Sequence, residues 1–273
     1  MKIKSGFNVV IPTYNSENTI FECISRLNFP FIEIYVVDSE SSDRTKELCS
    51  KFDNVNFINF KWNKKYPKKR NWTLFNVDLK YDWVLFLDSD EFVNENLIHE
   101  IGLKINNYAY KGYWIEYENY FNNKILKYGI KQKKLALFNK KFGKYEKIQL
   151  NYDSNLDMEI HEHPVINGPV STLKYNIRHQ DIRPLSNLLA KHIDYAIWEN
   201  YRVKEINNWS VLTLRQKLKY KLISSIFFPF IYFFMNYFIY LGFLDGKNGL
   251  NHSLFKFNYF LNIYLLLSEN DKK

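Results

Sequence analysis

The first hundred residues alternate between short apolar runs and stretches of helical periodicity, and this alternation constrains the fold more than any other feature. Each of four apolar runs is followed by a helix pattern, and the runs are 7–11, 32–37, 55–60 and 83–87. Runs that are apolar throughout are typical of strands covered on both faces. The pattern predicts an α/β fold with a mostly parallel central sheet and helices on both of its faces.

A polar segment follows each of the four predicted strands. These segments are 12–15, 38–43, 61–70 and 88–91. In open parallel sheets the ligand lies beyond the carboxyl ends of the strands. We therefore expect the four segments to converge on one cleft.

Helix signals are clear at two places in this half of the chain. Pro67 is suited to the first turn of a helix over 68–77. Asn94 is expected to cap a helix that turns Leu97, Ile98 and Ile101 inward. From residue 110 the pattern predicts further strands over 112–120, 135–139 and 170–177, which would extend the sheet with antiparallel pairs.

Asp88 and Asp90 are the first candidates for chemistry, because they follow a predicted strand with one residue between them. Two carboxylates at a strand end can meet one divalent cation, and oxygen ligands suit Mg²⁺ or Mn²⁺, above all where substrate phosphates complete the shell. Such a cation stabilises a departing diphosphate. The alternative is an acidic turn that caps the next helix.

Other polar side chains in the four segments suit a phosphorylated ligand. Asp38 can accept hydrogen bonds from a base or a ribose hydroxyl, while Lys69 and Arg70 can meet phosphate oxygens. The net charge of +9 also favours an anionic partner. No zinc-finger spacing or RNA-recognition signature accompanies the basic runs, so we expect no nucleic-acid partner. Cys23 and Cys49 are expected to be buried free thiols.

Taken together, the four segments resemble family 2 glycosyltransferases of the GT-A fold. The matching residues are Val10-Ile11-Pro12-Thr13-Tyr14-Asn15, Val36 to Asp43, Lys69-Arg70-Asn71 and Leu87-Asp88-Ser89-Asp90-Glu91. The resemblance implies an inverting transfer from a nucleotide-diphospho-sugar, UDP-hexose by default. It implies that Thr13 and Asp38 lie at the nucleoside, Asp88 near the ribose or the metal, and Asp90 on the metal. The expected nucleotide-sugar site is Pro12, Thr13, Tyr14, Asn15, Asp38, Ser39, Lys69, Arg70, Asp88 and Ser89.

The later chain is similar to the branch of that family that contains lipopolysaccharide-core β-glucosyltransferases. The similarity rests on His161-Glu162, on His179 followed by Asp181, on Tyr195 to Glu199 and on Gly242 to Gly246 with Gly249-Leu250. It implies a saccharide or lipid-linked acceptor in the synthesis of a lipopolysaccharide-type surface glycan. One departure is Glu40, which stands where the family often has glycine.

An inverting transfer needs one general base for the acceptor hydroxyl. Glu162 is the first candidate and Glu159 the second, with His161 or His163 as a third option. His179 is a candidate for the metal or the diphosphate, with a structural histidine as the alternative. Trp114 and Tyr117 could stack on a sugar, although core packing is the more common role of such residues.

Two domains are expected. Residues 1–183 would form the catalytic GT-A domain, with a nucleotide-sugar half (1–107) and an acceptor half (108–183), and 184–273 would form a helical, aromatic-rich C-terminal region. Residues 222–244 carry no charge and follow Lys217, Lys219 and Lys221. We expect this segment to lie in a membrane interface, which would place the protein peripherally on the cytoplasmic face of the inner membrane. A buried helix and a true span are the alternatives.

Other functions fit the sequence less well. A sugar nucleotidyltransferase would need a glycine-rich phosphate loop after the first strand, where this chain has Pro12-Thr13-Tyr14-Asn15. A P-loop NTPase would need a Gly-Lys-Ser/Thr segment, and a dinucleotide-binding oxidoreductase would need a G-x-G-x-x-G segment after a strand. The sequence has neither. A catalytically inactive nucleotide-binding scaffold at the membrane would be expected to lack the candidate metal carboxylates or the base.

Overall fold

The computed structural model describes residues 5–63, 66–107, 109–146, 163–179, 184–204 and 214–269. The chain forms two compact units. The first comprises Met1–Glu118, Gln132–Gln149 and Ser154–Gln180, and the second comprises Asn119–Lys131, Leu150–Asp153 and Asp181–Lys273. Each unit is therefore built from segments that are not continuous in sequence.

The first unit contains the predicted parallel sheet. Its strands β1 (Phe7–Thr13), β2 (Ile32–Asp38), β3 (Val55–Asn59) and β4 (Trp83–Phe86) pair in parallel in the order β3-β2-β1-β4. The chain order of these strands differs from their order in the sheet, so β1 lies between β2 and β4. This arrangement brings the segments that follow β1, β2 and β4 to the same edge, as the alternating pattern predicts.

Antiparallel pairing extends the sheet beyond β4. There β8 (Lys133–Asn139) pairs antiparallel with β4 and with β6 (Gly112–Phe121). Contrary to the expectation of antiparallel pairs throughout, β12 (Ile177–His179) pairs in parallel with β6, and β5 (Glu91–Phe92) then pairs antiparallel with β12. The single strand predicted over 170–177 is wrong, because β11 (Val170–Thr172) and β12 pair with different parts of β6. The intervening residues form a bend. A separate antiparallel pair is formed by β9 (Gly143–Tyr145) and β10 (Pro164–Ile166).

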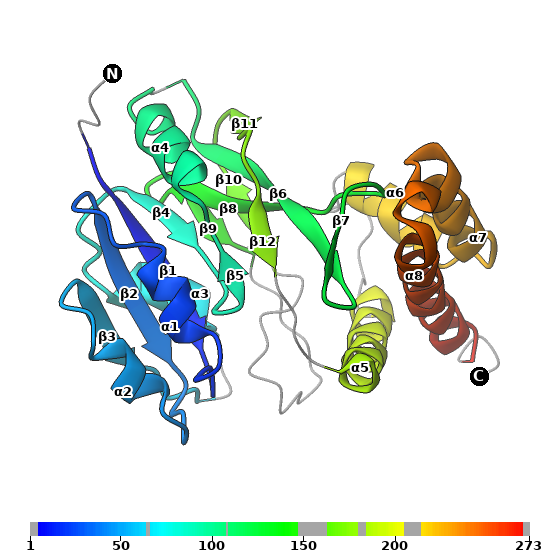
Figure 1. The fold of residues 1–273 in the computed structure, drawn as a ribbon, viewed down its shortest axis with the longest axis horizontal. Helices are drawn as coiled ribbons and strands as arrows, with labels where there is room; N and C mark the ends of the chain where they lie inside the picture. Colours follow the sequence, from blue (N-terminus) through cyan, green and yellow to red (C-terminus); the bar gives the residue numbers. More distant parts are fainter. Residues whose placement is uncertain are drawn as a thin grey trace. The chain divides into compact units, whose positions relative to one another are not determined.

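Helices cover both faces of this sheet (Figure 1). The helices α1 (Ile20–Ser25), α2 (Thr45–Cys49) and α4 (Glu95–Lys104) contribute to a core with Phe7, Val9 and Ile11 of β1. On the opposite face, α3 (Lys69–Asn76) packs over Val10 and the side chains beside it. Successive residues of β1 thus point into different cores, which is why the strand is mostly apolar on both faces. Asn94 caps α4 as predicted, accepting the Leu97 amide at 2.9 Å.

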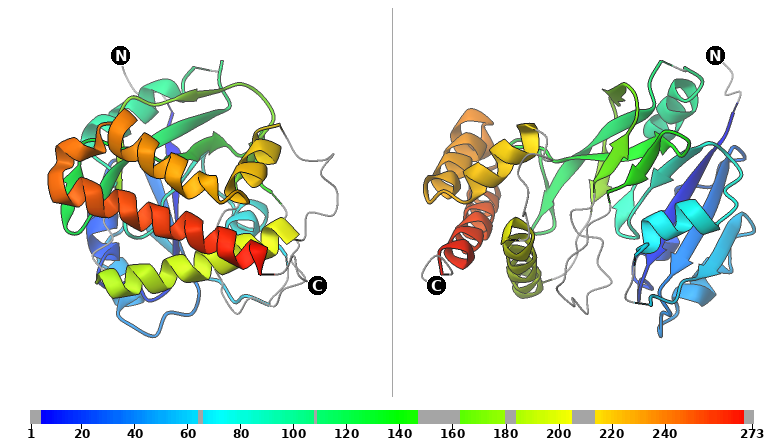
Figure 2. Two further views of the ribbon diagram at one scale, coloured as in Figure 1. Left: turned by 90° about the vertical axis from the view of Figure 1, so that its right-hand side faces the viewer. Right: turned by 180° about the vertical axis from the view of Figure 1, so that it is seen from behind.

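The second unit is helical, as predicted. It contains α5 (Leu185–Lys204), α6 (Leu214–Ile223), α7 (Phe227–Phe234) and α8 (Gly246–Ser268), with a π-helical turn η2 (Met235–Ile239) and a 3₁₀ turn η3 (Gly242–Asp245). The strand β7 (Lys124–Leu126) pairs with the end of β6. Figure 2 shows α8 running between α5 and α7, and Ala196, Tyr220, Ile223 and Ile263 form the centre of the core.

The buried side chains of α5 are not evenly distributed along the helix. Ala196 of α5 is buried, but Leu189 and Ile193 are exposed at 36% and 48%. The buried side chains lie instead in the C-terminal half of the helix, among them Trp198 and Glu199. The core of this unit therefore gathers around the end of α5 rather than along its length.

A buried polar group explains why the uncharged run over 222–244 is interrupted. The Asn236 side chain is 1% exposed, accepts the Ile130 amide at 2.7 Å and donates to Ser253 Oγ at 2.7 Å. The Asp245 carboxylate accepts the amides of Lys127 and Tyr128 at 3.1 and 2.9 Å. Together these two side chains attach the hairpin 119–131 to the C-terminal helices.

The glycines near Asp245 have a steric reason. A Cβ at Gly249 would lie 1.9 Å from the carbonyl oxygen of Gly242, and Gly246 has φ +60°. The close approach of η3 to the start of α8 thus requires Gly249, and the left-handed backbone between them favours glycine at position 246.

Within the part of the chain that the structure describes, no single helix is long and apolar enough to cross a membrane. One bent pair, Lys217–Ile223 with Phe227–Ile239, has the length and composition for it, and its two helices meet at 103°.

Candidate functional site

The carboxyl ends of β1 and β2 are joined through Thr13 and Asp38. These two residues are register partners in the parallel pair, and the Thr13 hydroxyl donates to Asp38 Oδ1 at 3.0 Å. Ser41 donates its amide to Asp38 Oδ2 at 2.8 Å and its hydroxyl to Oδ1 at 2.5 Å. Asp38 is 2% exposed, so these donors satisfy a buried carboxylate and fix its orientation.

The loop after β2 explains the departure at Glu40. Glu40 has φ 55°, in the left-handed region that glycine adopts without strain. Asn15 has φ 48°, and it links the two loops by donating its amide to Ser41 Oγ and accepting the Ser42 amide, at 2.8 and 2.9 Å. The sequence thus retains the loop geometry without the glycine.

Two cations hold Asp88 at the end of β4. Arg70 Nη2 donates to Asp88 Oδ1 at 2.8 Å, and Lys134 Nζ donates to Oδ2 at 3.1 Å. Desolvation alone would raise the pKa of Asp88, but the charges and hydrogen bonds of Lys134 and Arg70 hold it well below its usual range. Asp88 is therefore an ionised carboxylate with both oxygens in use.

Glu91 is a buried partner of this group that the sequence did not reveal. It is 2% exposed, accepts Lys134 Nζ at 2.9 Å and the Asp88 amide at 2.9 Å, and accepts the Tyr117 hydroxyl in a short hydrogen bond. Burial and the negative charge of Asp88 raise the pKa of Glu91, although the positive charge of Lys134 opposes this rise. Burial beside Glu91 likewise raises the pKa of Tyr117 well above its ordinary value. Tyr117 thus acts here as a hydrogen-bond donor that packs against the core.

Lys134 is the second side chain that was missed. It lies within β8, in the half of the chain assigned to the acceptor, and its side chain is 16% exposed. The only sequence signal was a lysine beside an otherwise apolar strand. Nothing in the sequence related that strand to β4, because their pairing is long-range.

Asp90 differs from Asp88 in its surroundings. Its Oδ2 lies 3.3 Å from His179 Nε2, and the two side chains are 28% and 42% exposed. Burial disfavours the protonated ring, but the hydrogen bond to Asp90 and the charges of Asp90 and Glu91 raise the pKa of His179. Asp90 and His179, two separate candidates for the metal that are 89 positions apart in the sequence, thus lie side by side.

In this pair the Asp90 carboxylate is the donor type that suits Mg²⁺ or Mn²⁺, and the His179 imidazole lies beside it as a second possible ligand. A carboxylate and an imidazole both reach solvent here, and such cations commonly take one or two protein ligands with water and substrate phosphates. Across the described ranges, no group of three or more His, Cys, Asp or Glu side chains is placed to hold a metal. The donor set therefore suits an open site that a phosphorylated ligand would complete.

The remaining predicted residues lie around these two centres. Lys69 is 5% exposed and donates Nζ to the Thr13 carbonyl at 3.1 Å, next to Arg70 in α3. The Ser39 amide donates to the same carbonyl at 3.0 Å. Ser89 donates to Ser16 Oγ at 3.0 Å, Pro12 is half-buried, and Tyr14 is 64% exposed. Hydrogen bonds thus connect Asp38 to Thr13 and Thr13 to Lys69. Arg70, the residue after Lys69, forms the ion pair with Asp88.

The candidate bases are outside this description. Glu159, Glu162 and His161 lie in 147–162, which is not among the described residues. His163 is described, and its amide donates to Glu146 Oε1 at 3.1 Å. The identity of the base stays a prediction.

Residues 8–160 match the family model described as Glycosyl transferase family 2, which is more than half of the chain. The chain belongs to this family. With the sheet order and the helices on both faces, this confirms the predicted GT-A fold with a helical C-terminal region.

Individual relatives match shorter stretches. Over 105 residues the chain is 34% identical to the poly(ribitol-phosphate) beta-N-acetylglucosaminyltransferase TarS of Staphylococcus aureus, covering 34% of this chain and 18% of TarS. It is 30% identical over 105 residues to the minor teichoic acid biosynthesis protein GgaA of Bacillus subtilis, covering 35% of this chain and 24% of GgaA. A crystal structure of S. aureus TarS 1–349 with UDP-GlcNAc aligns with 98% of this chain and 92% of that one, at 16% identity and a TM-score of 0.47. This chain therefore corresponds to less than a quarter of those curated relatives.

Proposed function

We propose that this protein transfers a sugar from a nucleotide-diphospho-sugar to a hydroxyl group of a cell-surface glycan. One observation carries the proposal: polar contacts lead from the Thr13–Asp38 pair at the ends of β1 and β2 through Lys69, and through Arg70 beside it, to the Asp88 carboxylate after β4, two residues before Asp90. A donor of this class has a nucleoside at one end and a diphosphate at the other. The two ends of the network have the groups that such a ligand needs.

The nucleoside end would be recognised by Asp38 and the loop beside it. Buried and oriented by Thr13 and Ser41, the Asp38 carboxylate can accept from a base N–H or a ribose hydroxyl without reorganising. Tyr14 is exposed next to it and offers a ring for stacking on the base. The name of TarS supports an N-acetylhexosamine as the transferred sugar, and a UDP-linked hexose is the donor that the motif resemblance implies.

The diphosphate end would be formed by Asp90 and His179. These residues would hold Mn²⁺ or Mg²⁺, and the cation would neutralise negative charge on the leaving diphosphate. Arg70 and Lys134 neutralise Asp88, so Asp88 does not repel the diphosphate as a free carboxylate would. By this division Asp90 is the metal ligand and Asp88 is a fixed anchor that can face the ribose.

The acceptor would be a hydroxyl of a surface polymer. The names of TarS and GgaA support an acceptor of the teichoic-acid type. A lipopolysaccharide-type acceptor is supported only by the motif similarity in the later part of the chain. An inverting reaction needs a base, and Glu162 remains the first candidate with Glu159 second. In a Glu162→Gln variant, donor binding should persist while transfer is lost.

The metal assignment can be tested with two carboxylates at opposite ends of β4. Asp90→Asn should weaken Mn²⁺-dependent binding of UDP at least about tenfold in calorimetry, because the carboxylate ligand is lost. Asp82→Asn is the matched control, since Asp82 precedes the same strand and pairs with Lys141 at 2.6 Å.

A panel of UDP, GDP, dTDP and CMP sugars, with hydrolysis as the readout, would identify the donor. Equal UDP affinity for the parent and for Asp90→Asn would remove Asp90 from the metal site. Absence of binding to every nucleotide by the folded parent would contradict the proposed function.

A further inference from the structure

An exposed apolar surface runs along the second unit from α6 to η3. In α7 the exposed side chains Phe227, Phe230, Ile231 and Phe234 recur at the i, i+3, i+4 and i+7 spacing of one helix face, and they are 51% to 69% exposed. Exposed leucines precede them in α6, and exposed apolar residues follow in η2 and η3; these are Leu214, Leu218, Leu222, Phe238, Ile239, Tyr240, Leu241, Phe243 and Leu244. We call this set the apolar face.

The apolar face is distinct from the core of the unit. The opposite side of α7 is packed, because Phe228 and Tyr232 lie 4.8 and 4.7 Å from the Phe260 ring and Phe233 faces Phe257. The same holds in α6, where Tyr220 and Ile223 are buried. Phe230 also contacts the Phe257 ring at 5.0 Å, yet it stays 57% exposed. Both helices therefore have a packed inner face and a second apolar face that their own unit leaves largely exposed. Exposed apolar side chains gathered in such numbers on neighbouring elements mark sites of protein or membrane contact.

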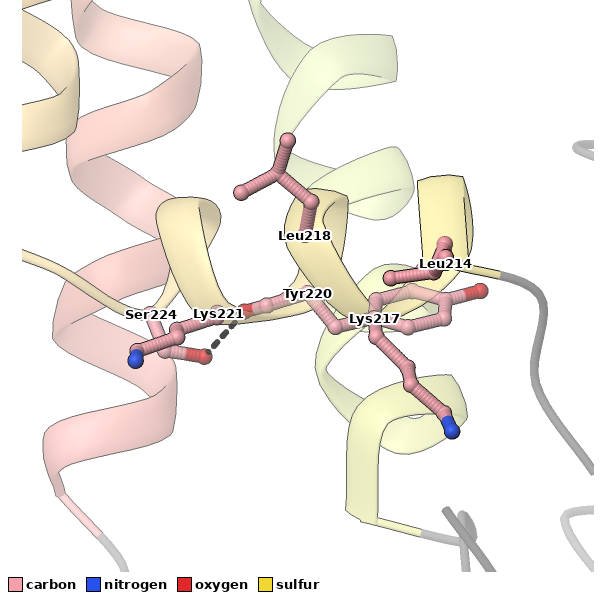
Figure 3. A pocket seen from close by; sticks show the side chains of 6 residues that line it. All are labelled: Leu214, Lys217, Leu218, Tyr220, Lys221 and Ser224. Atoms are coloured by element: carbon pink, nitrogen blue, oxygen red, sulfur yellow. Dashed lines mark hydrogen bonds between the residues drawn. The ribbon is translucent and has the colours of Figure 1, made fainter. Parts of the chain in front are cut away.

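Charge within the segment 214–244, which carries the apolar face, is of one sign, and the first acidic residue after it is Asp245. Between Leu214 and Leu244 the sequence has Arg215, Lys217, Lys219 and Lys221 and no acidic residue. Figure 3 shows Lys217 and Lys221 lining a surface pocket of about 560 Å³ with Leu214, Leu218, Tyr220 and Ser224. The two ammonium groups are one helical turn apart, on the same helix as the exposed leucines. Basic groups beside apolar side chains are complementary to a bilayer that carries anionic lipid.

We propose that the apolar face docks on the surface of a membrane that contains anionic lipid. The phenylalanines of α7 and η2 enter the boundary between headgroups and acyl chains, and Lys217 and Lys221 meet lipid phosphates. The proposal concerns attachment only and does not depend on the reaction proposed above.

Two observations favour docking over crossing the bilayer. The helices α6 and α7 meet at 103°, so no straight apolar helix spans the required length in the described residues. In addition, Lys219 pairs at 2.7 Å with Glu199, which is 2% exposed. A span through α6 would carry this ion pair into hydrocarbon, which is costly.

Self-association fits the apolar face less well. An isologous contact pairs a patch with itself. A second copy would therefore bring lysines against lysines with no acidic residue of the same segment to compensate them.

The test is flotation of the full chain with vesicles. We expect binding to vesicles of phosphatidylcholine with 30% phosphatidylglycerol, and binding at least tenfold weaker to phosphatidylcholine alone or in 0.5 M salt, on the order expected for two lysines at the surface. Phe227→Ser with Phe234→Ser should weaken binding at least about tenfold, because two phenylalanines no longer enter the interface. The matched control is Phe21→Ser with Phe75→Ser, two phenylalanines of the first unit that are 47% and 54% exposed.

A second pair tests the charge separately. Lys217→Gln with Lys221→Gln should reduce binding to the anionic vesicles and leave the weak binding to phosphatidylcholine unchanged. Lys51→Gln with Lys104→Gln, two exposed lysines of the first unit, is the control. Circular dichroism on each variant verifies that it is folded.

Three outcomes would overturn the proposal. The first is no binding of the folded parent to anionic vesicles. The second is equal loss in the test and control pairs. The third is a concentration-dependent dimer in light scattering that Phe227→Ser with Phe234→Ser abolishes, which would assign the apolar face to a second copy.

Discussion

Asp88 and Asp90 are two residues apart and differ in almost every physical respect. Asp88 is held by Arg70 and Lys134, whereas Asp90 is paired only loosely with His179 at 3.3 Å among the contacts described above. A carboxylate between two cations is a poor metal ligand, because binding the metal would require displacing both. The difference in surroundings is the reason for proposing Asp90, and not Asp88, as the metal ligand.

Lys134 is the residue on which this arrangement depends most. Its ammonium group bridges Asp88 and the buried Glu91. Removing it leaves the Glu91 carboxylate buried without its cation, so Lys134→Met should lower the free energy of unfolding by roughly 3 kcal/mol. Urea unfolding at pH 7 measures the change.

The neighbouring lysine provides the control for that substitution. Lys133 pairs with Glu116 at 3.0 Å, and its side chain is 47% exposed. Lys133→Met should change the same free energy by less than about 1 kcal/mol. Adding Glu91→Gln to Lys134→Met should recover part of the loss, and no recovery would show that the loss has another cause.

At the scale of elements, the contact between η3 and the start of α8 is the least tolerant of change. A methyl group at Gly249 would meet the backbone of Gly242, which cannot move aside as a flexible side chain could. Gly249→Ala should therefore lower the free energy of unfolding by roughly 2–3 kcal/mol in urea titrations. A methyl group at Gly246 would lie in open space, and only the φ of +60° disfavours a side chain there. Gly246→Ala should therefore lower the free energy of unfolding by only about 1 kcal/mol. Equal losses would contradict the steric explanation.

The packing of α8 against the end of β6 makes the second unit sensitive to acid. His252 is 7% exposed beside Phe121, and burial together with the charge of Lys256 lowers its pKa to about 3. The unfolded chain has an ordinary histidine pKa near 6.5, so it binds the proton first. This contribution to stability is complete above pH 6.5 and is lost as the pH falls towards 3. At pH 5 the loss is roughly 2 kcal/mol.

The measurement is the difference in unfolding free energy between pH 7 and pH 5. His252→Gln cannot titrate and should reduce that difference by the stated amount. His99→Gln, which removes an exposed histidine of α4, should leave it unchanged. A pH dependence that is the same in the parent and in His252→Gln would exclude His252 as the source.

Local sequence patterns were sufficient for the elements whose partners are dictated by burial. The apolar runs 7–11, 32–37, 55–60 and 83–87 are all strands, and Asn94 caps α4. They were insufficient where a side chain's role depends on a strand far away in sequence. Lys134 meets Asp88 only because β8 pairs with β4, and the buried Asn236 side chain is fixed by the Ile130 amide, 106 positions away. The candidate residues Thr13, Asp38, Lys69, Arg70 and Asp88 do lie together, while their roles stay predictions.

At the scale of the whole molecule, both cysteines belong to the first unit. Cys23 and Cys49 are buried, and burial raises the pKa of both thiols, that of Cys49 to about 12. A protonated and buried thiol does not react, so a thiol reagent should label the native chain at least a hundredfold more slowly than the chain in urea. Labelling then reports the opening of the first unit alone.

Release of the chromophore from Ellman's reagent is the readout, with Cys23→Ala and Cys49→Ala separating the two thiols. At pH 7 the Gly249→Ala variant should leave the slow labelling unchanged, because its defect lies in the second unit. Rapid labelling of the native parent would show that the first unit opens readily.

The hairpin 119–131 has a consequence for how such proteins can be recombined. It leaves the first unit in mid-sequence and is bound by Asn236 and Asp245 from the C-terminal helices. A chimera that exchanged only the residues after 183 would separate the Ile130, Lys127 and Tyr128 amides from their acceptors. Successful exchange, in the laboratory or in evolution, requires that the two sequence segments be inherited together.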